Sequence, residues 1–288
     1  MRIVECFRPG RPAVSFEFFP PRTETGFATL YRTIAELKRL DPAFVSVTWG
    51  AGGSTRRQTE ELVTRIQGEI GLTAMAHLTC VGSSREELAA ILDRFAGAGI
   101  DNILALGGDP PRDAPEYVPP PDGFTYANEL VAFIRSRWGF CVGAACYPET
   151  HPRAASAEAD LAHLVRKVEA GADFLISQLF FDNEDYFGFV QRARAAGIRV
   201  PIVPGIMPIV SRQNILRIAS LARARIPDEL DRELERAGDD PARTLEVGIA
   251  WATEQCRELL AHGAPGIHFY TLNQSPATRR IHAALFGA

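Results

Sequence analysis

Short runs rich in β-branched and aromatic residues alternate with longer amphipathic runs along the whole chain, and this alternation constrains the fold more than any other feature. The pattern is typical of repeated βα units on a parallel sheet, where each strand is followed by a helix that covers it. Eight strands are expected, at residues 13–18, 43–49, 73–80, 102–106, 141–147, 174–180, 201–206 and 266–272. Eight βα units in 288 residues predict an α/β fold, a (β/α)8 TIM barrel built as a single domain over residues 1–288.

Helical periodicity follows every expected strand, at residues 26–40, 55–68, 84–98, 126–138, 156–170, 184–196, 211–224 and 275–286. Ser84 and Ser156 precede acidic residues as helix-capping residues do, and Ala-Gly pairs ending at Gly99, Gly171 and Gly197 terminate three of the helices. The charged segment 226–243 and a helical run at 241–262 have no strand before them. We therefore expect an extra helical insertion before the eighth strand.

A doubly wound open sheet is the alternative fold for such a pattern. No Gly-x-Gly-x-x-Gly sequence follows the first strand, so a dinucleotide would be bound without the Rossmann fingerprint.

Charge and hydropathy exclude several classes of protein. Hydrophobic residues make up 46% of the chain and charged residues 23%, which is ordinary for a globular protein with a large core. The net charge of -4 gives no electrostatic basis for binding nucleic acid. No apolar run approaches the roughly 18 residues of a membrane span and no signal-peptide pattern opens the chain, so we expect no membrane partner and a cytoplasmic location.

The five cysteines include no Cys-x-x-Cys pair, which argues against a disulfide framework or a zinc finger. His77 and Cys80 lie three residues apart in an apolar strand, a spacing that places them awkwardly for one shared ion. We expect buried thiols and no metal site.

Polar residues lie near the carboxyl ends of nearly all the expected strands, where the active sites of such barrels are built. They are Glu17, Thr48, His77, Asp109, Tyr147, Gln178 and Tyr270. Glu17 stands between Phe16 and Phe18, and a carboxyl group that loses hydration among aromatic rings favours the neutral form that a general acid needs. A glutamate that reaches solvent or pairs with an arginine is the commoner alternative.

Two further segments suggest ligand contacts. Asp109 follows two glycines, which let a backbone approach a ligand closely, although an aspartate that caps the following turn fits equally well. The helix expected at 156–170 carries four polar residues on neighbouring turns that suit an anion or a ribose, or an ordinary solvated helix face: Asp160, His163, Arg166 and Lys167.

Six motifs occur in order along almost the entire chain. They are Phe16-Glu17-Phe18-Phe19-Pro20-Pro21, Val47-Thr48-Trp49-Gly50-Ala51-Gly52-Gly53, His77-Leu78-Thr79-Cys80, Gly108-Asp109-Pro110-Pro111, Tyr147-Pro148-Glu149-Thr150-His151-Pro152 and His268-Phe269-Tyr270-Thr271-Leu272-Asn273. Each motif alone is weak, but together they resemble the methylenetetrahydrofolate reductases, of the bacterial type that consists of the catalytic barrel.

The resemblance implies a flavoenzyme of one-carbon metabolism that supplies methionine synthesis. FAD would take a hydride from NADH or NADPH and pass it to methylenetetrahydrofolate in two half-reactions, with Glu17 as the acid that opens the folate ring and Asp109 beside flavin and pterin. A homo-oligomer is also expected. The implied FAD-binding residues are Thr48, Trp49, Ala51, His77, Gly107, Gly108, Asp109, Tyr126, Tyr147, His151, Ala154, Asp160, His163, Arg166 and Lys167. The implied substrate-binding residues are Glu17, Asp109, Gln178, Asn214, Tyr270 and Gln274.

Some positions depart from that pattern. Gly107 stands where many related chains have arginine, and Gln274 stands where arginine or lysine is common. These departures predict weaker binding of FAD and of the glutamate tail of folate.

Three rival functions are compatible with such a barrel. A proline-oxidising type of flavoenzyme would not need Glu17 and Gln178. A barrel without cofactor would act as a scaffold, and a metal-dependent hydrolase would use His77, Cys80, Asp109 and His151, although barrel hydrolases generally carry more histidine ligands.

Overall fold

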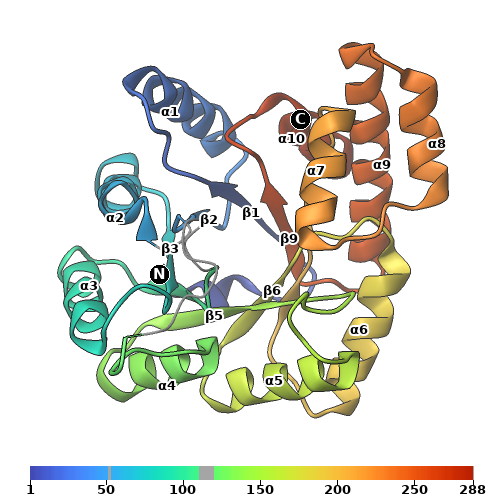
Figure 1. The fold of residues 1–288 in the computed structure, drawn as a ribbon. Helices are drawn as coiled ribbons and strands as arrows, with labels where there is room; N and C mark the ends of the chain where they lie inside the picture. The colour runs from blue at the N-terminus through green and yellow to red at the C-terminus, as the bar shows by residue number, and fades with distance from the viewer. Residues whose placement is uncertain (51–52, 110–119, 288) are drawn as a thin grey trace.

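The computed structural model describes residues 1–50, 53–109 and 120–287, and these form one parallel sheet curled into a barrel, with helices around it (Figure 1). The sheet order is β7-β6-β5-β4-β3-β2-β1-β9-β8, and every pairing is parallel. The strands are β1 (Ala13–Phe18), β2 (Phe44–Val47), β3 (Ala74–Thr79), β4 (Asn102–Leu106), β5 (Cys141–Cys146), β6 (Phe174–Ser177), β7 (Ile202–Val203), β8 (Gly205–Ile206) and β9 (Gly266–Tyr270). The TIM-like barrel expected from the alternation is confirmed.

The expected seventh strand is two short pieces rather than one. β7 pairs with β6 and β8 pairs with β9, so the two ends of the sheet are joined through consecutive residues and the barrel is nearly closed. Pro204 separates the pieces and has no N–H to donate to a neighbouring strand, although its carbonyl accepts a hydrogen bond from His268 N at 3.0 Å. The sequence pattern gave the position of this strand but not its interruption.

The helices begin and end close to their expected bounds. They are α1 (Glu24–Lys38), α2 (Arg56–Arg65), α3 (Arg85–Gly97), α4 (Ala127–Arg137), α5 (Ala157–Glu169), α6 (Asn183–Ala195), α7 (Arg212–Ala222), α8 (Asp228–Ala237), α9 (Pro241–Ala261) and α10 (Pro276–Phe286), with a π-helical turn η3 (Ile66–Ile70) after α2. Ser84 forms a capping box with Glu87, and Ser156 Oγ accepts the Ala159 N–H, as the sequence predicted.

The insertion before the last strand is confirmed as the helix pair α8 and α9, which stands with α7 on one side of the barrel (Figure 1). Leu230 and Leu234 of α8 are fully buried against a cluster that includes Val247 and Trp251 of α9. The charged residues that marked this segment in the sequence therefore form the outer face of an amphipathic helix.

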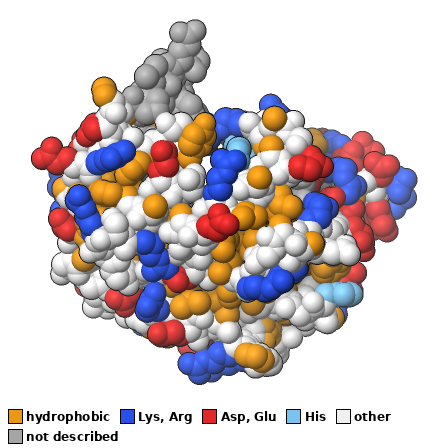
Figure 2. Space-filling model, turned by 90° about the horizontal axis from the view of Figure 1, so that it is seen from below, with side chains coloured by type: hydrophobic (Ala, Val, Ile, Leu, Met, Phe, Trp, Pro, Cys, Tyr) orange, Lys and Arg blue, Asp and Glu red, His pale blue; other side chains and the backbone are white. Residues whose placement is uncertain are grey.

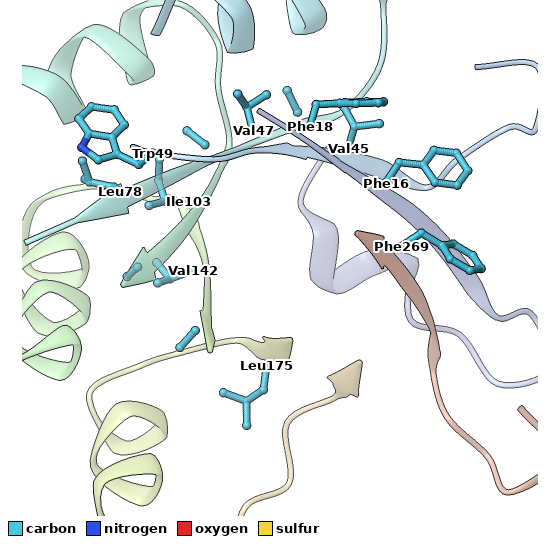
Figure 3. Close-up of a cluster of buried hydrophobic side chains, with 14 of the residues drawn as sticks. Phe16, Phe18, Val45, Val47, Trp49, Leu78, Ile103, Val142, Leu175 and Phe269 are labelled. Atoms are coloured by element: carbon cyan, nitrogen blue, oxygen red, sulfur yellow. The ribbon is translucent and has the colours of Figure 1, made fainter. Parts of the chain in front are cut away.

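Alternate residues of each strand face the helices and fill the outer core. Phe16, Phe18, Val45 and Val47 belong to this layer (Figure 3), and the rings of Phe16 and Phe269 lie 6.2 Å apart. Burying side chains of this size contributes about 1.5–3 kcal/mol each.

A second apolar cluster fills the lower barrel interior, where Phe44, Met75, Leu104 and Phe174 meet. The 3-10 helix η1 (Ile3–Cys6) adds Ile3 to it, whose backbone N–H donates to Asn102 Oδ1 at 2.8 Å. The barrel is thus plugged below, and its polar side chains lie towards the carboxyl ends of the strands.

Candidate active site

Glu17 lies on the inner wall of the barrel, on the opposite face of β1 from its aromatic neighbours. Phe16 and Phe18 are in the outer core (Figure 3), so they do not surround the carboxyl group as the sequence suggested. The Glu17 Oε2 atom lies 3.5 Å from His77 Nε2 and 3.8 Å from His268 Nε2. Its side chain is 20% exposed, so the carboxyl group is sheltered by histidines while remaining accessible from the barrel mouth.

His77 gives Glu17 a neutral neighbour. Burial lowers the pKa of His77 to about 4, against a smaller opposing effect of the Glu17 charge. Among the described residues Glu17 pairs with the two histidines and with no arginine or lysine. The carboxyl group is therefore not committed to a permanent ion pair.

His268 is fixed below Glu17 by residues that the sequence reasoning did not single out. Ser15 Oγ lies 2.8 Å from His268 Nδ1, Ser46 Oγ lies 3.4 Å from Nε2, and the ring of Phe44 stacks on the imidazole at 5.8 Å. The period-two alternation of a strand could have found this set, because Ser15 precedes Glu17 by two residues and His268 precedes Tyr270 by two.

The segment after β9 holds the end of β1 in place. Thr271 Oγ1 donates to the Glu17 carbonyl at 2.6 Å, and the Asn273 side chain bonds both the N–H and the carbonyl of Phe19, at 3.0 and 2.8 Å. Asn273 has a φ of 58°, in the left-handed region that asparagine tolerates better than most residues. The position of Glu17 therefore depends on the turn after β9.

Tyr270 faces the mouth beside Glu17. Its hydroxyl donates to the Ser177 carbonyl at 2.6 Å, and burial together with the Glu17 carboxylate raises its pKa well above the ordinary range. Tyr270 is therefore a neutral phenol that ties β9 to β6.

The backbone at the end of β4 comes close to β3. Gly108 has a φ of +87°, and a Cβ on it would lie 2.8 Å from the Thr79 Cβ. Asp109 follows as an exposed residue. Beside this turn, His77 Nε2 and Thr79 Oγ1 are buried and form no hydrogen bond with a described residue, since the 3.5 Å contact of His77 Nε2 with Glu17 Oε2 lacks hydrogen-bond geometry. These two polar atoms could hydrogen-bond to a bound polar molecule, and Gly108, which has no side chain, leaves room for it beside them.

A third group lies where β5 leads into α5. The rings of Tyr147 and His151 are 4.5 Å apart, and the His151 N–H donates to Asp160 Oδ2 at 2.8 Å. Lys167 Nζ donates to the Ala145 carbonyl at 2.9 Å and lies 5.9 Å from the Tyr147 ring. The structure thus brings together four of the residues that the resemblance implies for FAD, namely Tyr147, His151, Asp160 and Lys167.

The charges of this group act on one another. Burial raises the pKa of Tyr147 to about 12, and the carboxylates of Asp109 and Asp160 add to the rise. Burial lowers the pKa of Lys167 and of His151. Asp109 is therefore electrostatically coupled to the group at the start of α5.

The remaining predicted residues lie around this centre or away from it. The Thr48 N–H donates to a carbonyl of β1, and its carbonyl accepts a hydrogen bond from α2. Gln178 lies half-buried at the end of β6, and the Ala154 N–H donates to the His151 carbonyl in a turn. Exposed residues are His163 and Arg166 on α5, Asn214 in the first turn of α7, Gln274 after β9 and Tyr126 at the start of α4. The Trp49 indole is buried in the outer core (Figure 3), and Ala51 lies outside the described residues.

The cysteines are buried as expected, with the exception of Cys6, which is half-buried, and all five are free thiols. Among the described residues, no three His, Cys, Asp or Glu side chains lie close enough together to form a metal site.

No helix in the described part of the chain combines the length and apolar character of a membrane span. The surface drawn in Figure 2 mixes basic and acidic side chains, with no broad basic area on that face.

Comparison with known proteins places this geometry in a family. Residues 2–285 match the family model described as methylenetetrahydrofolate reductase. The chain is 42% identical to "Methylenetetrahydrofolate reductase (NADH) 1" of Arabidopsis thaliana over 94% of its own length and 48% of that protein. It is 40% identical to "5,10-methylenetetrahydrofolate reductase" of Pectobacterium carotovorum over 94% of its length and 89% of that protein.

The chain thus spans about half the length of the plant relatives and about nine tenths of the bacterial one. Among solved structures, a protein of Clostridium thermocellum that binds two copies of 5-methyl-5,6,7,8-tetrahydrofolic acid superimposes with a TM-score of 0.68 at 14% identity, over 95% of this chain and 93% of that one. That likeness supports the fold alone. The match of the family model over nearly the whole sequence, together with 40% identity to bacterial and plant members, shows that this chain belongs to the methylenetetrahydrofolate reductase family.

Proposed function

We propose that this protein reduces 5,10-methylenetetrahydrofolate to 5-methyltetrahydrofolate with NADH or NADPH as the hydride donor and FAD as the bound cofactor. The observation that carries the proposal is Glu17, a carboxyl group at the barrel mouth whose partners among the described residues are histidines, of which His77 is neutral. Family membership supplies the substrate class, and the site supplies the acid.

Glu17 acts as the general acid. It protonates the folate so that the five-membered ring opens to an iminium, whose methylene carbon then accepts the hydride. His77 has a pKa of about 4, so at neutral pH it carries no positive charge that would hold Glu17 as a carboxylate. His268, fixed by Ser15 and Ser46, keeps the carboxyl group aimed along the inner wall.

Bound FAD would supply the hydride chemistry, as the carrier between the nicotinamide and the methylene carbon. The residues that would hold its ring system are those with unpaired or accessible polar groups at the ends of β3 and β4: His77, Thr79, Gly108 and Asp109. The group at the start of α5 would hold the ribityl and phosphate part, with Lys167 as the cation and Tyr147, His151 and Asp160 around it. The buried Trp49 would contribute through its backbone, and the exposed His163 and Arg166 would lie at the outer end.

The folate would lie on the other side of the mouth. Tyr270 stands beside Glu17 in the register of β1 and β9 and offers a neutral phenol ring there, and Gln178 follows Ser177 of β6, whose carbonyl accepts the Tyr270 hydroxyl. Asn214 and Gln274 are exposed and would reach the distal part of the substrate. We further propose that one domain, residues 1–288, carries both half-reactions, that the protein acts in the cytoplasm in the route to methionine, and that copies assemble into a homo-oligomer.

The test is product analysis with the purified protein. With added FAD, NADH and methylenetetrahydrofolate, we expect 5-methyltetrahydrofolate to form in equal amount to the NADH consumed. A yellow protein that oxidises NADH without forming this product would favour a different flavoenzyme, of the proline-oxidising type or another. A protein that neither binds FAD nor turns over NADH would favour a scaffold.

A further inference from the structure

Arg153 reaches from the loop after β5 to the end of the neighbouring strand β4, and neither strand pattern nor helix periodicity points to it. Its Nη2 atom donates to the Gly108 carbonyl at 3.3 Å, and its backbone N–H donates to His151 Nδ1 at 3.0 Å. The guanidinium group therefore lies between the turn that carries Asp109 and the group at the start of α5.

The charge of Arg153 is directed at this site. It lowers the pKa of His151 and opposes the rise in the pKa of Tyr147. Other arginines at the surface bind carboxylates, such as Arg94 with Glu60 and Arg280 with Glu246, whereas Arg153 has no ion-pair partner among the described residues. The residue is exposed, so its guanidinium N–H groups remain accessible from the mouth.

A side chain at position 107 would point towards the guanidinium group of Arg153. Among the described residues, and apart from its chain neighbours, a Cβ built on Gly107 would meet a single atom within 4 Å, the Arg153 Nη2 at 4.0 Å. Gly107 does not have a positive φ, so a larger residue fits its backbone. An arginine at position 107 and the arginine at position 153 would therefore place their charges in the same part of the barrel mouth. This chain has glycine at 107 and arginine at 153.

We propose that Arg153 binds the pyrophosphate of FAD and supplies the cation that Gly107 lacks. This inference rests on the proposed function, because it takes FAD as the ligand. A guanidinium group has a planar set of N–H donors that matches the oxygens of a phosphate, and the ammonium group of Lys167, 5.9 Å from the centre of the Tyr147 ring, is a second cation in this group. Two cations from separate segments would then share the two phosphate charges.

The experiment measures flavin affinity and requires no turnover. The protein is freed of flavin and titrated with FAD and with riboflavin, which lacks the pyrophosphate, and the quenching of flavin fluorescence gives each Kd. Arg153→Ala is compared with the wild type, with the double variant Arg153→Ala/Gly107→Arg, and with Arg32→Ala, an exposed arginine of α1 as the matched control.

Removal of a charged hydrogen bond predicts a rise in the FAD Kd of about tenfold to a hundredfold in Arg153→Ala, with the riboflavin Kd unchanged. The double variant should recover most of the FAD affinity, Arg32→Ala should match the wild type, and the loss caused by Arg153→Ala should shrink at high salt, which screens the charge.

Two results would overturn the inference while leaving the proposed function intact. One is an FAD Kd in Arg153→Ala equal to that of a wild type that binds FAD. The other is an equal loss for riboflavin, which would mean that Arg153 only shapes the loop through Gly108. A wild-type protein that fails to bind FAD would overturn the proposed function, and this inference with it.

Discussion

At the scale of single residues, the carboxyl group of Glu17 is mostly buried but can still be reached from the barrel mouth. Its Oε2 atom lies between the Nε2 atoms of His77 and His268, and a fifth of the side chain remains exposed. The sequence pointed to Glu17 for a partly wrong reason, since Phe16 and Phe18 face the outer core. The residues next to Glu17 in the sequence lie on the opposite face of the strand and do not contact its carboxyl group. Its histidine neighbours come from other strands, so they become apparent only in the closed barrel.

Glu17→Gln tests the role of the proton at nearly unchanged side-chain size. We expect FAD binding and flavin reduction by NADH to stay within about threefold of the wild type, and folate turnover to fall by about 10²–10⁴, the usual contribution of general acid catalysis. Rapid-mixing absorbance of each half-reaction measures this separately. Glu254→Gln, an exposed carboxylate of α9, is the control, and normal folate turnover in Glu17→Gln would remove Glu17 from the acid role.

The pKa of His77 predicts a pH dependence of stability. Because this pKa is about 4 in the folded protein against an ordinary 6.5, the unfolded chain takes up the proton first as the pH falls. The stability contributed by neutral His77 is complete above pH 6.5 and is lost towards pH 4, by an amount on the order of 3 kcal/mol.

His77→Gln should therefore lose less stability than the wild type between pH 7 and pH 4.5. Urea unfolding of both proteins at the two pH values measures this difference. An equal loss in both would show that folding does not lower the pKa of His77.

At the scale of elements, the sequence predicted strands and helices well because each βα unit carries its own periodicity and its own capping residues. The capping boxes and glycine ends are local signals, so they need no tertiary context. The sequence did not predict the split of the seventh strand, because β7 and β8 have two residues each and are too short to show a periodic pattern. Pro201 and Pro204 in the same run did indicate an interruption, since proline has no N–H to donate within a sheet. The 3-10 helix η1, which closes the lower end of the barrel, was not predicted either, because it is also very short.

Gly205 tests how the barrel closes. A Cβ there would lie 2.4 Å from the Ser177 carbonyl oxygen and 2.5 Å from the Tyr270 ring, so Gly205→Ala must push β6 and β9 apart. We expect a loss of about 1–3 kcal/mol in the free energy of unfolding, as for other overpacked sites.

Gly97→Ala is the matched substitution, because a Cβ on that helical glycine would meet no described atom within 4 Å outside its own helix backbone and chain neighbours. It should stabilise the protein by up to about 1 kcal/mol. Urea unfolding compares the two variants, and a Gly205→Ala protein as stable as the wild type would contradict the close packing at the junction of β6, β8 and β9.

At the scale of the whole molecule, the active-site face is built from segments distant in the sequence. Thr271 and Asn273 hold the end of β1 across more than 250 residues of chain, and Arg153 reaches the turn after β4. The sequence pointed to residues at strand ends but gave no role to Ser15 and Arg153, nor to His268 and Asn273 within their motif, because the contribution of these four arises from contacts between units. Periodicity describes each unit by itself, while these contacts depend on how the barrel closes.

Anaerobic stopped-flow absorbance at the flavin band tests the claim that one barrel carries both half-reactions. The FAD-loaded protein is mixed first with NADH and then with methylenetetrahydrofolate. We expect the flavin band to bleach in the first step and to return in the second, with 5-methyltetrahydrofolate formed in the amount of flavin reoxidised. Bleaching that methylenetetrahydrofolate cannot reverse would contradict the claim.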